Sequence, residues 1–323
     1  MTEALDSSSP QRFSEIEEQG KELMDQSLAL LLDGCGQEGM EHLIAGLGQI
    51  RRRSSADAWQ QWAATACLDH SLRSVVHQCP FTFHSFSKPR GYAGDAELLD
   101  FIYGHKRPSD ELSSIGREVF TYCMKASMPS AVRERLAIIR GLVDGQAKQS
   151  SKPVRILSLA CGHCREAADS EALGERRISQ WIAFDQDAES LRFIQETYGK
   201  HPIIPVHGSI HSLGRHLRDM NSFDLIYACG LYDYLADKSA QRLTRSLFEK
   251  LRLGGRLVVG NFLPDQREVG YMDTFMSWHL IYRTLQQLEE LAAGIPAAQR
   301  RIKVSADDQQ SIGYLEITKT KVT

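Results

Sequence analysis

Two neighbouring stretches of the chain combine residue types that suit the binding of a nucleoside. The motif C-G-H-C at 161–164 follows the apolar run VRILSLA, and Asp185 ends the next β-rich run, 23 residues after Gly162. A tight turn with a glycine lets a ligand approach the backbone and offers N–H groups at the start of a helix. An acid at the end of the neighbouring strand can accept hydrogen bonds from both hydroxyls of a ribose. Together the two stretches predict a nucleoside site.

The number of glycines narrows the kind of nucleoside. A dinucleotide site needs three glycines in G-x-G-x-x-G so that a pyrophosphate can reach the N-terminus of the helix. The stretch from Ala160 to Cys164 has one glycine, which leaves poor access for a pyrophosphate. A sulfonium nucleoside with an amino-acid tail needs less room. The sequence therefore favours such a ligand over a dinucleotide.

The cysteine pair of the same motif allows a second interpretation. A C-x-x-C that opens a helix after a strand is how a thiol–disulfide oxidoreductase presents its reactive thiolate, so Cys161 and Cys164 could do redox chemistry. The pattern of five strands that begins at this motif is too long for a small redox domain. A zinc site would need two further ligands at suitable spacing, and we predict no metal.

The elements that must position these residues fall into two halves. From Ser14 to Gly145 the apolar spacing is mostly helical, except for a stretch with a proline and two glycines at Phe81–Asp95, after which Asp95 is placed to cap a helix. A helix is also expected from Tyr271 to about Ala293, restarted by a capping box at Thr284.

After Pro153, β-rich runs alternate with helical patterns. This alternation predicts an α/β fold with a doubly wound parallel sheet and helices on both faces, closed by a hairpin. We expect a helical N-terminal domain at 1–149 and an α/β domain at 150–323. The predicted strands are Val154–Ala160, Gln180–Asp185, Ile203–His207, Phe223–Cys229, Arg256–Phe262, Arg301–Ser305 and Gly313–Thr318.

Composition excludes several classes of protein. The 323 residues are 42% hydrophobic and 24% charged, which excludes a disordered or collagen-like chain. A net charge of -3 gives no overall basic field for nucleic acid. No apolar run is long enough to span a bilayer, and the N-terminus lacks the pattern of a signal peptide. We therefore expect a cytoplasmic protein with reduced cysteines, no nucleic-acid partner and no membrane insertion.

The order of five segments, LSLACG, AFDQD, HGSI, SFDLIYACG and KLRLGGRLVV, resembles the class I S-adenosylmethionine-dependent methyltransferase family over about 150–320. The resemblance implies S-adenosylmethionine as cofactor and S-adenosylhomocysteine as product. The family often has an acid where Ser158 stands and glycines where Ala160 and Cys164 stand. The cofactor-binding residues that the resemblance implies are Ser158, Ala160 and Gly162 near the methionine moiety, Asp185 and Gln186 at the ribose, Ser209 and Ile210 at the adenine, and Cys229 and Gly230 closing the pocket.

A narrower resemblance covers both halves of the chain. KPRGYAGDAELLDFIYG, NFLPDQ, MSWHLIYRT and IGYLEITK are similar to a bacterial methyltransferase group that includes enzymes making methyl esters of 3-hydroxy fatty acids as extracellular signals. This similarity implies that the helical half belongs with the enzyme. The glycine-bearing stretch of that half is then expected to act as a lid.

The chemistry at the acceptor depends on the atom that is methylated. A carboxylate is already ionised near pH 7 and needs a clamp, for which Arg90, Tyr92, His279 and Arg283 are available, whereas a hydroxyl or amine needs a base such as His279 or Asp233. Aromatic residues around the expected mouth favour a small apolar or aromatic acceptor. The residues assigned to catalysis are Tyr92, Asp233 and His279, and those assigned to the acceptor are Arg90, Tyr232, Asn261, Trp278, Tyr282 and Arg283. A sensor that binds the cofactor without turnover stays open as an alternative, and so does a homodimer.

Overall fold

The computed structural model describes residues 13–66, 68–218, 220 and 222–321, and the chain forms two compact units. One unit contains the chain up to Pro129 together with Asp265–His279, and the other contains Ser130–Pro264 and Leu280–Thr323. The division at Pro129 lies inside a long helix, 20 residues before the boundary predicted from the sequence. The C-terminal part of that helix is bonded into the α/β unit, for example through Arg256 Nε, which donates to Gln146 Oε1 over 2.7 Å.

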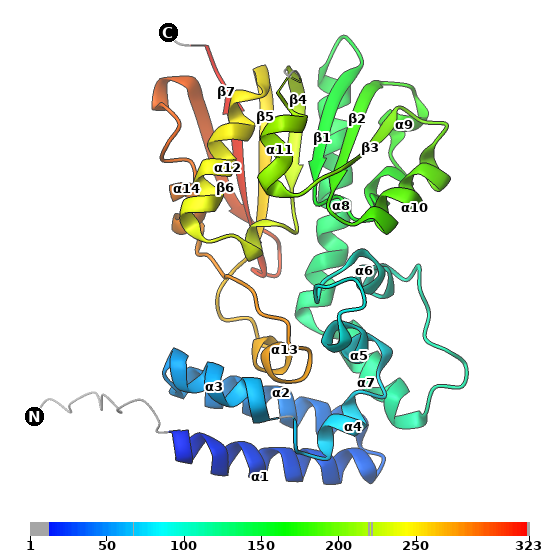
Figure 1. Cartoon of the computed structure of the whole chain (residues 1–323), viewed down its shortest axis with the longest axis vertical. Helices are drawn as coiled ribbons and strands as arrows, with labels where there is room; N and C mark the ends of the chain where they lie inside the picture. Colours follow the sequence, from blue (N-terminus) through cyan, green and yellow to red (C-terminus); the bar gives the residue numbers. More distant parts are fainter. Residues whose placement is uncertain (1–12, 67, 219, 221, 322–323) are drawn as a thin grey trace, which may run out of the picture. The chain divides into compact units, whose positions relative to one another are not determined.

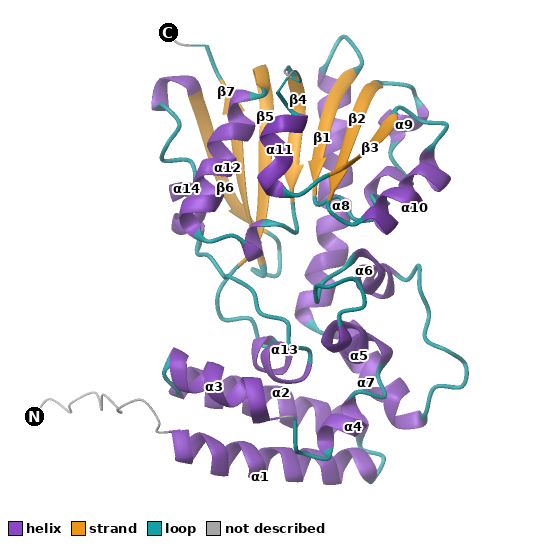
Figure 2. Cartoon of the chain, in the orientation of Figure 1, coloured by secondary structure: helices purple, strands orange, loops and turns teal. Residues whose placement is uncertain are grey.

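The helical unit is built from amphipathic helices and loops (Figure 2). Its first two helices pack together and bury Ile16, Leu31, Leu43 and Leu47. The helices are α1 (Phe13–Leu32), α2 (Gly36–Arg53), α3 (Ala56–Ala66), α4 (Leu72–Val76), α5 (Pro80–Ser87), α6 (Ala96–Tyr103), α7 (Ser114–Lys125) and α13 (Val269–Phe275). The long helix α8 (Ser127–Gln149) begins in this unit and continues into the other.

The stretch Phe81–Asp95, predicted to be irregular throughout, is helical in its first part. Pro80 occupies the first turn of α5, where its missing N–H removes no helical hydrogen bond, and Lys88 ends the helix in a left-handed conformation with φ 50°. Only the segment from Lys88 to Asp95 is a loop. The predicted cap is confirmed, because the Asp95 carboxylate accepts a 2.8 Å hydrogen bond from Leu98 N at the start of α6.

The helix predicted from Tyr271 to about Ala293 is broken into two short helices. α13 ends at Phe275, and α14 (Leu285–Glu290) begins after nine non-helical residues, 276–284. The apolar residues keep their helical spacing through this segment, so the spacing gave no sign of the break. The chain passes from one unit to the other here. The capping box is confirmed: Gln287 N donates to Thr284 Oγ1 and Thr284 N donates to Gln287 Oε1.

The α/β unit contains a seven-stranded sheet in the order β3-β2-β1-β4-β5-β7-β6 (Figure 1). The first five strands are parallel, and β7 pairs antiparallel with both β5 and β6. All seven predicted strands are present, with ends shifted by at most five residues. The bounds are β1 (Val154–Leu159), β2 (Ile178–Asp185), β3 (Ile203–His207), β4 (Phe223–Ala228), β5 (Leu251–Phe262), β6 (Arg300–Ala306) and β7 (Ile312–Lys319). The predicted doubly wound fold with a closing hairpin is confirmed.

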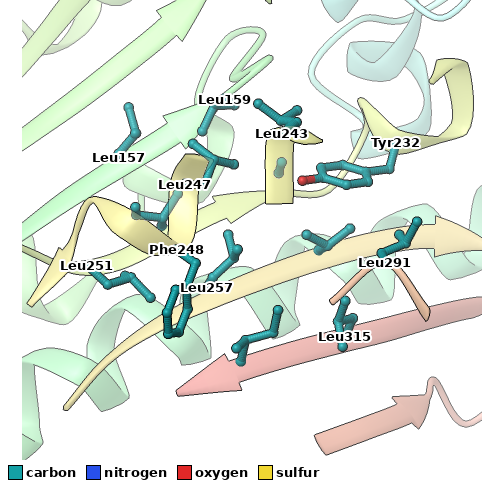
Figure 3. Packing of buried hydrophobic residues seen from close by; sticks show 14 of the residues in the cluster. Leu157, Leu159, Tyr232, Leu243, Leu247, Phe248, Leu251, Leu257, Leu291 and Leu315 are labelled. Carbon is teal, nitrogen blue, oxygen red and sulfur yellow. The ribbon is translucent and has the colours of Figure 1, made fainter. Parts of the chain in front are cut away.

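Short helices and turns connect the strands. The longest of them, α12, packs Leu243, Leu247 and Phe248 against alternate residues of the strands, as Figure 3 shows. These alternate residues, such as Leu157 and Leu257, define one face of the sheet. The connecting elements are η1 (Arg165–Ala167), α9 (Glu171–Gly174), α10 (Ala188–Tyr198), η2 (Ile210–Ser212), α11 (Leu213–His216), η3 (Tyr232–Tyr234), α12 (Asp237–Glu249), α14 and η4 (Ala297–Gln299). No helix in the part of the chain that the structure describes is long and apolar enough to cross a bilayer.

Candidate functional site

The strand order reverses between β1 and β4. From β1 the chain proceeds outward to β2 and β3, and then returns to β4 and β5 on the other side (Figure 1). Because these strands are parallel, their carboxyl ends meet at one edge of the sheet. Ligands of open α/β sheets bind at this edge, beside the point where the order reverses. The residues that follow β1, β2, β4 and β5 are therefore the candidates for a binding site.

The loop after β1 alternates left-handed residues. Ala160, Gly162 and Cys164 have φ values of 49°, 52° and 49°. This conformation costs little for glycine and more for residues with a Cβ. This backbone conformation would suit glycine at Ala160 and Cys164, the first and third of these positions. The loop is tight, since Cys164 N donates to Cys161 O over 2.9 Å, and Ala160 is exposed.

Asp185, at the end of β2, holds this loop in place. Its Oδ2 accepts a 2.8 Å hydrogen bond from Gly162 N, and its Oδ1 accepts a 2.9 Å bond from Asp187 N. Burial raises the pKa of the Asp185 carboxyl above its usual value. A carboxylate offers about four lone-pair positions, so each oxygen can accept a further donor. Asp185 therefore fits the hydroxyls of a ribose, with the glycine loop beside it.

The segment after β3 lies next to Asp185. Gly208 N donates to Asp185 O over 2.9 Å, and a Cβ at Gly208 would approach the Phe184 ring to 2.8 Å. Ser209 and Ile210 follow at the start of η2 and are half-buried. Gln186 contributes its carbonyl oxygen, 3.0 Å from His207 Nε2. The structure thus brings the predicted ribose and adenine residues together at the carboxyl ends of β2 and β3.

Ser158 forms a hydrogen bond inside the sheet. Its side chain is fully buried, and its Oγ accepts a 3.2 Å hydrogen bond from Trp181 Nε1. The predicted cofactor residue is therefore bound to a protein partner. Sequence reasoning assigned no role to a neighbouring acid, Glu166, which lies in η1 and accepts hydrogen bonds from Tyr227 OH over 2.5 Å and from Cys164 Sγ over 3.7 Å. Burial raises the pKa of the Glu166 carboxyl.

The cysteine pair lacks the environment of a reactive thiolate. Burial and the carboxylates of Asp185 and Glu166 raise the pKa of Cys161, and burial and Glu166 raise that of Cys164. A redox-active thiol needs the opposite shift. This environment does not favour the oxidoreductase interpretation. Within the described residues, no group of three or more His, Cys, Asp or Glu side chains is arranged to hold a metal ion.

After β4 and β5, on the other side of the point where the strand order reverses, a buried arginine holds the loops together. Arg283 Nη1 donates to Tyr232 O and to Asn261 Oδ1, each over 2.7 Å. Its Nη2 donates to Leu235 O and to Asp237 Oδ1. Asn261 Nδ2 in turn donates to Ile281 O over 2.8 Å. These predicted acceptor residues are thus brought together, but with their polar groups directed to protein partners.

Asp233 and Tyr232 lie in the same loop. Asp233 Oδ1 accepts a 2.7 Å hydrogen bond from Phe262 N, and burial raises the pKa of its carboxyl to about 6, against opposing effects that include Arg135 and Arg283. Tyr232 is fully buried, with its hydroxyl 3.0 Å from Thr244 Oγ1 of α12. Cys229, also buried, and Gly230 lead into this loop directly after β4.

Three large apolar side chains beside these loops are exposed. Tyr234, Ile281 and Leu285 have 42%, 39% and 36% of their surface accessible. Ile281 N donates to Asp233 O over 2.7 Å, which places Ile281 next to the η3 turn that contains Tyr234. We call Tyr234, Ile281 and Leu285 the apolar patch. Tyr282, half-buried, lies within the same segment.

The remaining predicted residues lie in the helical unit. Lys88 Nζ donates to Ser277 Oγ over 3.0 Å, so the loop that carries Arg90 and Tyr92 lies beside the segment that carries Trp278 and His279. Arg90 and Tyr92 are half-buried, and Trp278 is buried.

In the helical unit, His279 and His84 each pair with a carboxylate. The exposed His279 ring has Nδ1 3.1 Å from Asp273 Oδ1. Sequence reasoning missed His84, whose Nε2 lies 2.8 Å from Asp95 Oδ2 at the base of the same loop. His84 lies in α5, 11 residues before Asp95, and no motif in the sequence indicates that the two side chains meet.

Comparison with known proteins agrees with this geometry. Residues 157–259 match the family model described as "Methyltransferase domain". No curated protein matches the sequence significantly. A solved structure described as a possible exported protein from Bordetella parapertussis is 17% identical, with a TM-score of 0.60, and the similarity covers 82% of this chain and 95% of that one.

Two further solved structures share the fold. The CurJ carbon methyltransferase is 13% identical, with a TM-score of 0.52 over 95% of this chain and 92% of its own. The CMeT domain of the citrinin polyketide synthase is 16% identical, with a TM-score of 0.50 over 81% and 69%. The segment that matches the methyltransferase domain, residues 157–259, contains both the left-handed loop at Gly162 and Asp185, the acid that ends β2, so this part of the chain is similar to a methyltransferase domain in sequence and in fold.

Proposed function

We propose that this protein transfers the methyl group of S-adenosylmethionine to the carboxylate of a small apolar acid, with a fatty acyl or aromatic body. The observation that carries this proposal is the apolar patch, which lies at the carboxyl edge of the sheet beside loops whose polar groups are bound internally. An acceptor recognised there gains more from burying apolar surface than from hydrogen bonds.

A carboxylate acceptor agrees with the state of Asp233. This acid was the candidate base of the α/β unit, but it is buried and accepts a hydrogen bond from Phe262 N. A carboxylate is ionised near pH 7 and needs no base. Its oxygen forms a bond to the methyl carbon while the carbon–sulfur bond breaks, and the electron pair of that bond stays on sulfur. The products are a methyl ester and S-adenosylhomocysteine, and no proton is transferred.

The cofactor supplies the reactive methyl group, and the protein aligns the acceptor with it. In this proposal the left-handed loop at Ala160 and Gly162 approaches the methionine moiety, and Asp185 binds the ribose beside Gln186. The other residues of the cofactor site are Ser209 and Ile210 at the adenine and Cys229 and Gly230 at the end of β4.

On the acceptor side, we assign apolar surface to Tyr282 of the α/β unit. The acceptor roles of Arg90, Tyr92, Trp278 and His279, which lie in the helical unit, stay predictions from the sequence. The polar groups of Arg283, Asn261 and Tyr232 already have protein partners. Their role is to position the loops that carry the apolar patch.

Product chemistry tests this function. The protein is incubated with S-adenosylmethionine carrying a tritiated methyl group and a panel of saturated and 3-hydroxy fatty acids and benzoic acids, with the matching alcohols and amides as controls. We expect label only in the acids, released as volatile methanol by mild alkali because a methyl ester hydrolyses. Label that resists alkali would contradict carboxyl methylation and indicate transfer to carbon or nitrogen. Cofactor binding without turnover on the whole panel would favour the sensor.

A further inference from the structure

The acid that the family often carries on the first strand is absent here, and a different buried carboxylate lies close to the same place. Ser158 stands at that position and is bonded to Trp181. Tyr227 lies on the neighbouring strand β4 and is paired with Ser158 in the sheet. Tyr227 also donates to Glu166 Oε1 over 2.5 Å. The Glu166 carboxylate is therefore bonded to the residue that pairs with Ser158 in the sheet.

Glu166 is costly to bury as it stands. It is 6% exposed, and burial raises its pKa against the opposing effects of the Tyr227 hydroxyl, its own backbone, the Cys164 thiol and the charge of Arg135. Tyr227 OH and Cys164 Sγ both donate to Oε1, so neither of these two donors occupies Oε2. A buried carboxylate is stabilised strongly by a cation that arrives with a ligand.

S-adenosylmethionine carries such a cation in its amino-acid tail. Glu166 lies two residues after Cys164, the last left-handed residue of the loop to which the methionine moiety is assigned. From these observations we propose that Glu166 binds the ammonium group of S-adenosylmethionine, in place of the acid missing at Ser158. The inference rests on the methyl-donor site of the proposed function and adds the residue that recognises the amino group.

The test pairs a change in the protein with a change in the ligand. S-adenosylhomocysteine and its analogue without the amino group are titrated calorimetrically into the wild type, Glu166→Gln and Glu171→Gln. Glu171 is a matched control because it is an exposed acid of the next helix, bonded to Lys148. A hydrogen bond between charged groups predicts that the wild type and the control bind the amino ligand about 10-fold to 100-fold more tightly than the analogue. Glu166→Gln should bind the two ligands about equally.

Two further variants separate recognition from a structural role. Tyr227→Phe removes the hydrogen bond to Glu166 but keeps the carboxylate, so it should still prefer the amino ligand. Glu166→Asp keeps the charge and withdraws it by one methylene, so it should weaken binding of S-adenosylhomocysteine and leave the analogue unchanged. Glu166→Asp also serves if Glu166→Gln fails to fold, which thermal unfolding will reveal.

The outcomes distinguish this inference from the proposed function. If the folded wild type binds neither ligand, the methyl-donor site itself is wrong. If the wild type binds S-adenosylhomocysteine and Glu166→Gln keeps its full preference over the analogue, only the role of Glu166 is overturned. The same holds if Tyr227→Phe and Glu166→Gln lose the preference together, because that result indicates a structural effect of the shared hydrogen bond.

Discussion

At the ends of β1 and β2, Asp185 binds Gly162 N and Asp187 N and still has lone pairs for a ligand. At the ends of β4 and β5, Arg283 instead directs its donors to Tyr232, Leu235, Asn261 and Asp237. The first half of the edge can recognise a polar ligand with its side chains, whereas the second is closed internally and presents apolar surface. Under the proposed function, this difference means that one edge of the sheet recognises the cofactor by specific hydrogen bonds and the acceptor by burial of apolar surface.

The largest expected effect comes from removing Arg283, which binds the loops after β4 and β5; we call these loops the closed half of the edge. Arg283→Met should lower the free energy of unfolding by about 3–5 kcal/mol, since it leaves Asn261 and a set of buried carbonyls without their cation. Urea unfolding followed by circular dichroism measures the change. Arg245→Met is the control, because Arg245 pairs with Glu249 on the exposed surface of α12 and should change stability by less than about 0.5 kcal/mol. Equal losses in the two variants would contradict the role of the Arg283 network.

The pKa of Asp233 gives the closed half a pH dependence. The value in the folded protein, about 6, lies above the ordinary 3.8. The folded state therefore binds a proton more tightly than the unfolded state, and this stabilisation is present below about pH 4 and is lost as the pH rises through about 6. We expect the free energy of unfolding to fall by up to about 3 kcal/mol over this range relative to Asp233→Asn. Parallel profiles for the two proteins would show that Asp233 titrates normally.

If the apolar patch binds the acceptor, removing one of its side chains should affect long acceptors more than short ones. Ile281→Ser should raise the KM for a long-chain acid by roughly 5–30-fold, from a loss of about 1–2 kcal/mol of apolar burial, and should leave the KM for a short acid nearly unchanged. Leu253→Ser is the control, because Leu253 is 54% exposed at the start of β5, the other end of that strand. The idea fails if the two variants change the dependence on chain length equally.

The smallest effect concerns the cap that follows Arg283. Thr284 Oγ1 accepts a hydrogen bond from Gln287 N at the start of α14. Thr284→Ala should cost about 1 kcal/mol of stability without affecting binding of S-adenosylhomocysteine. Thermal unfolding and calorimetry on the same sample give both values. A change in cofactor affinity would mean that the two halves of the edge are coupled.

The sequence predicted the sheet well, but it did not predict the internal partners of the loops after β4 and β5, for physical reasons. Each strand is a short apolar run that is visible within a few residues, and the strand-end positions of Gly162 and Asp185 follow from local order. Arg283 looks like a free cation in sequence, because its partners at 232–237 lie about 50 residues away. Glu166 has the same difficulty, since its donor Tyr227 is 61 residues distant. Apolar spacing also continued through 276–284, where the chain leaves one unit for the other and forms no helix.

The most direct test of the account is calorimetric titration of S-adenosylhomocysteine into the wild type and Asp185→Ala. We predict micromolar binding to the wild type and a loss of roughly 10-fold to 100-fold in the variant, because the carboxylate binds both the ribose and the glycine loop. Thermal unfolding should show that the variant is folded. Absence of binding to the folded wild type, or equal binding to both proteins, would contradict a methyl-donor site built on Asp185.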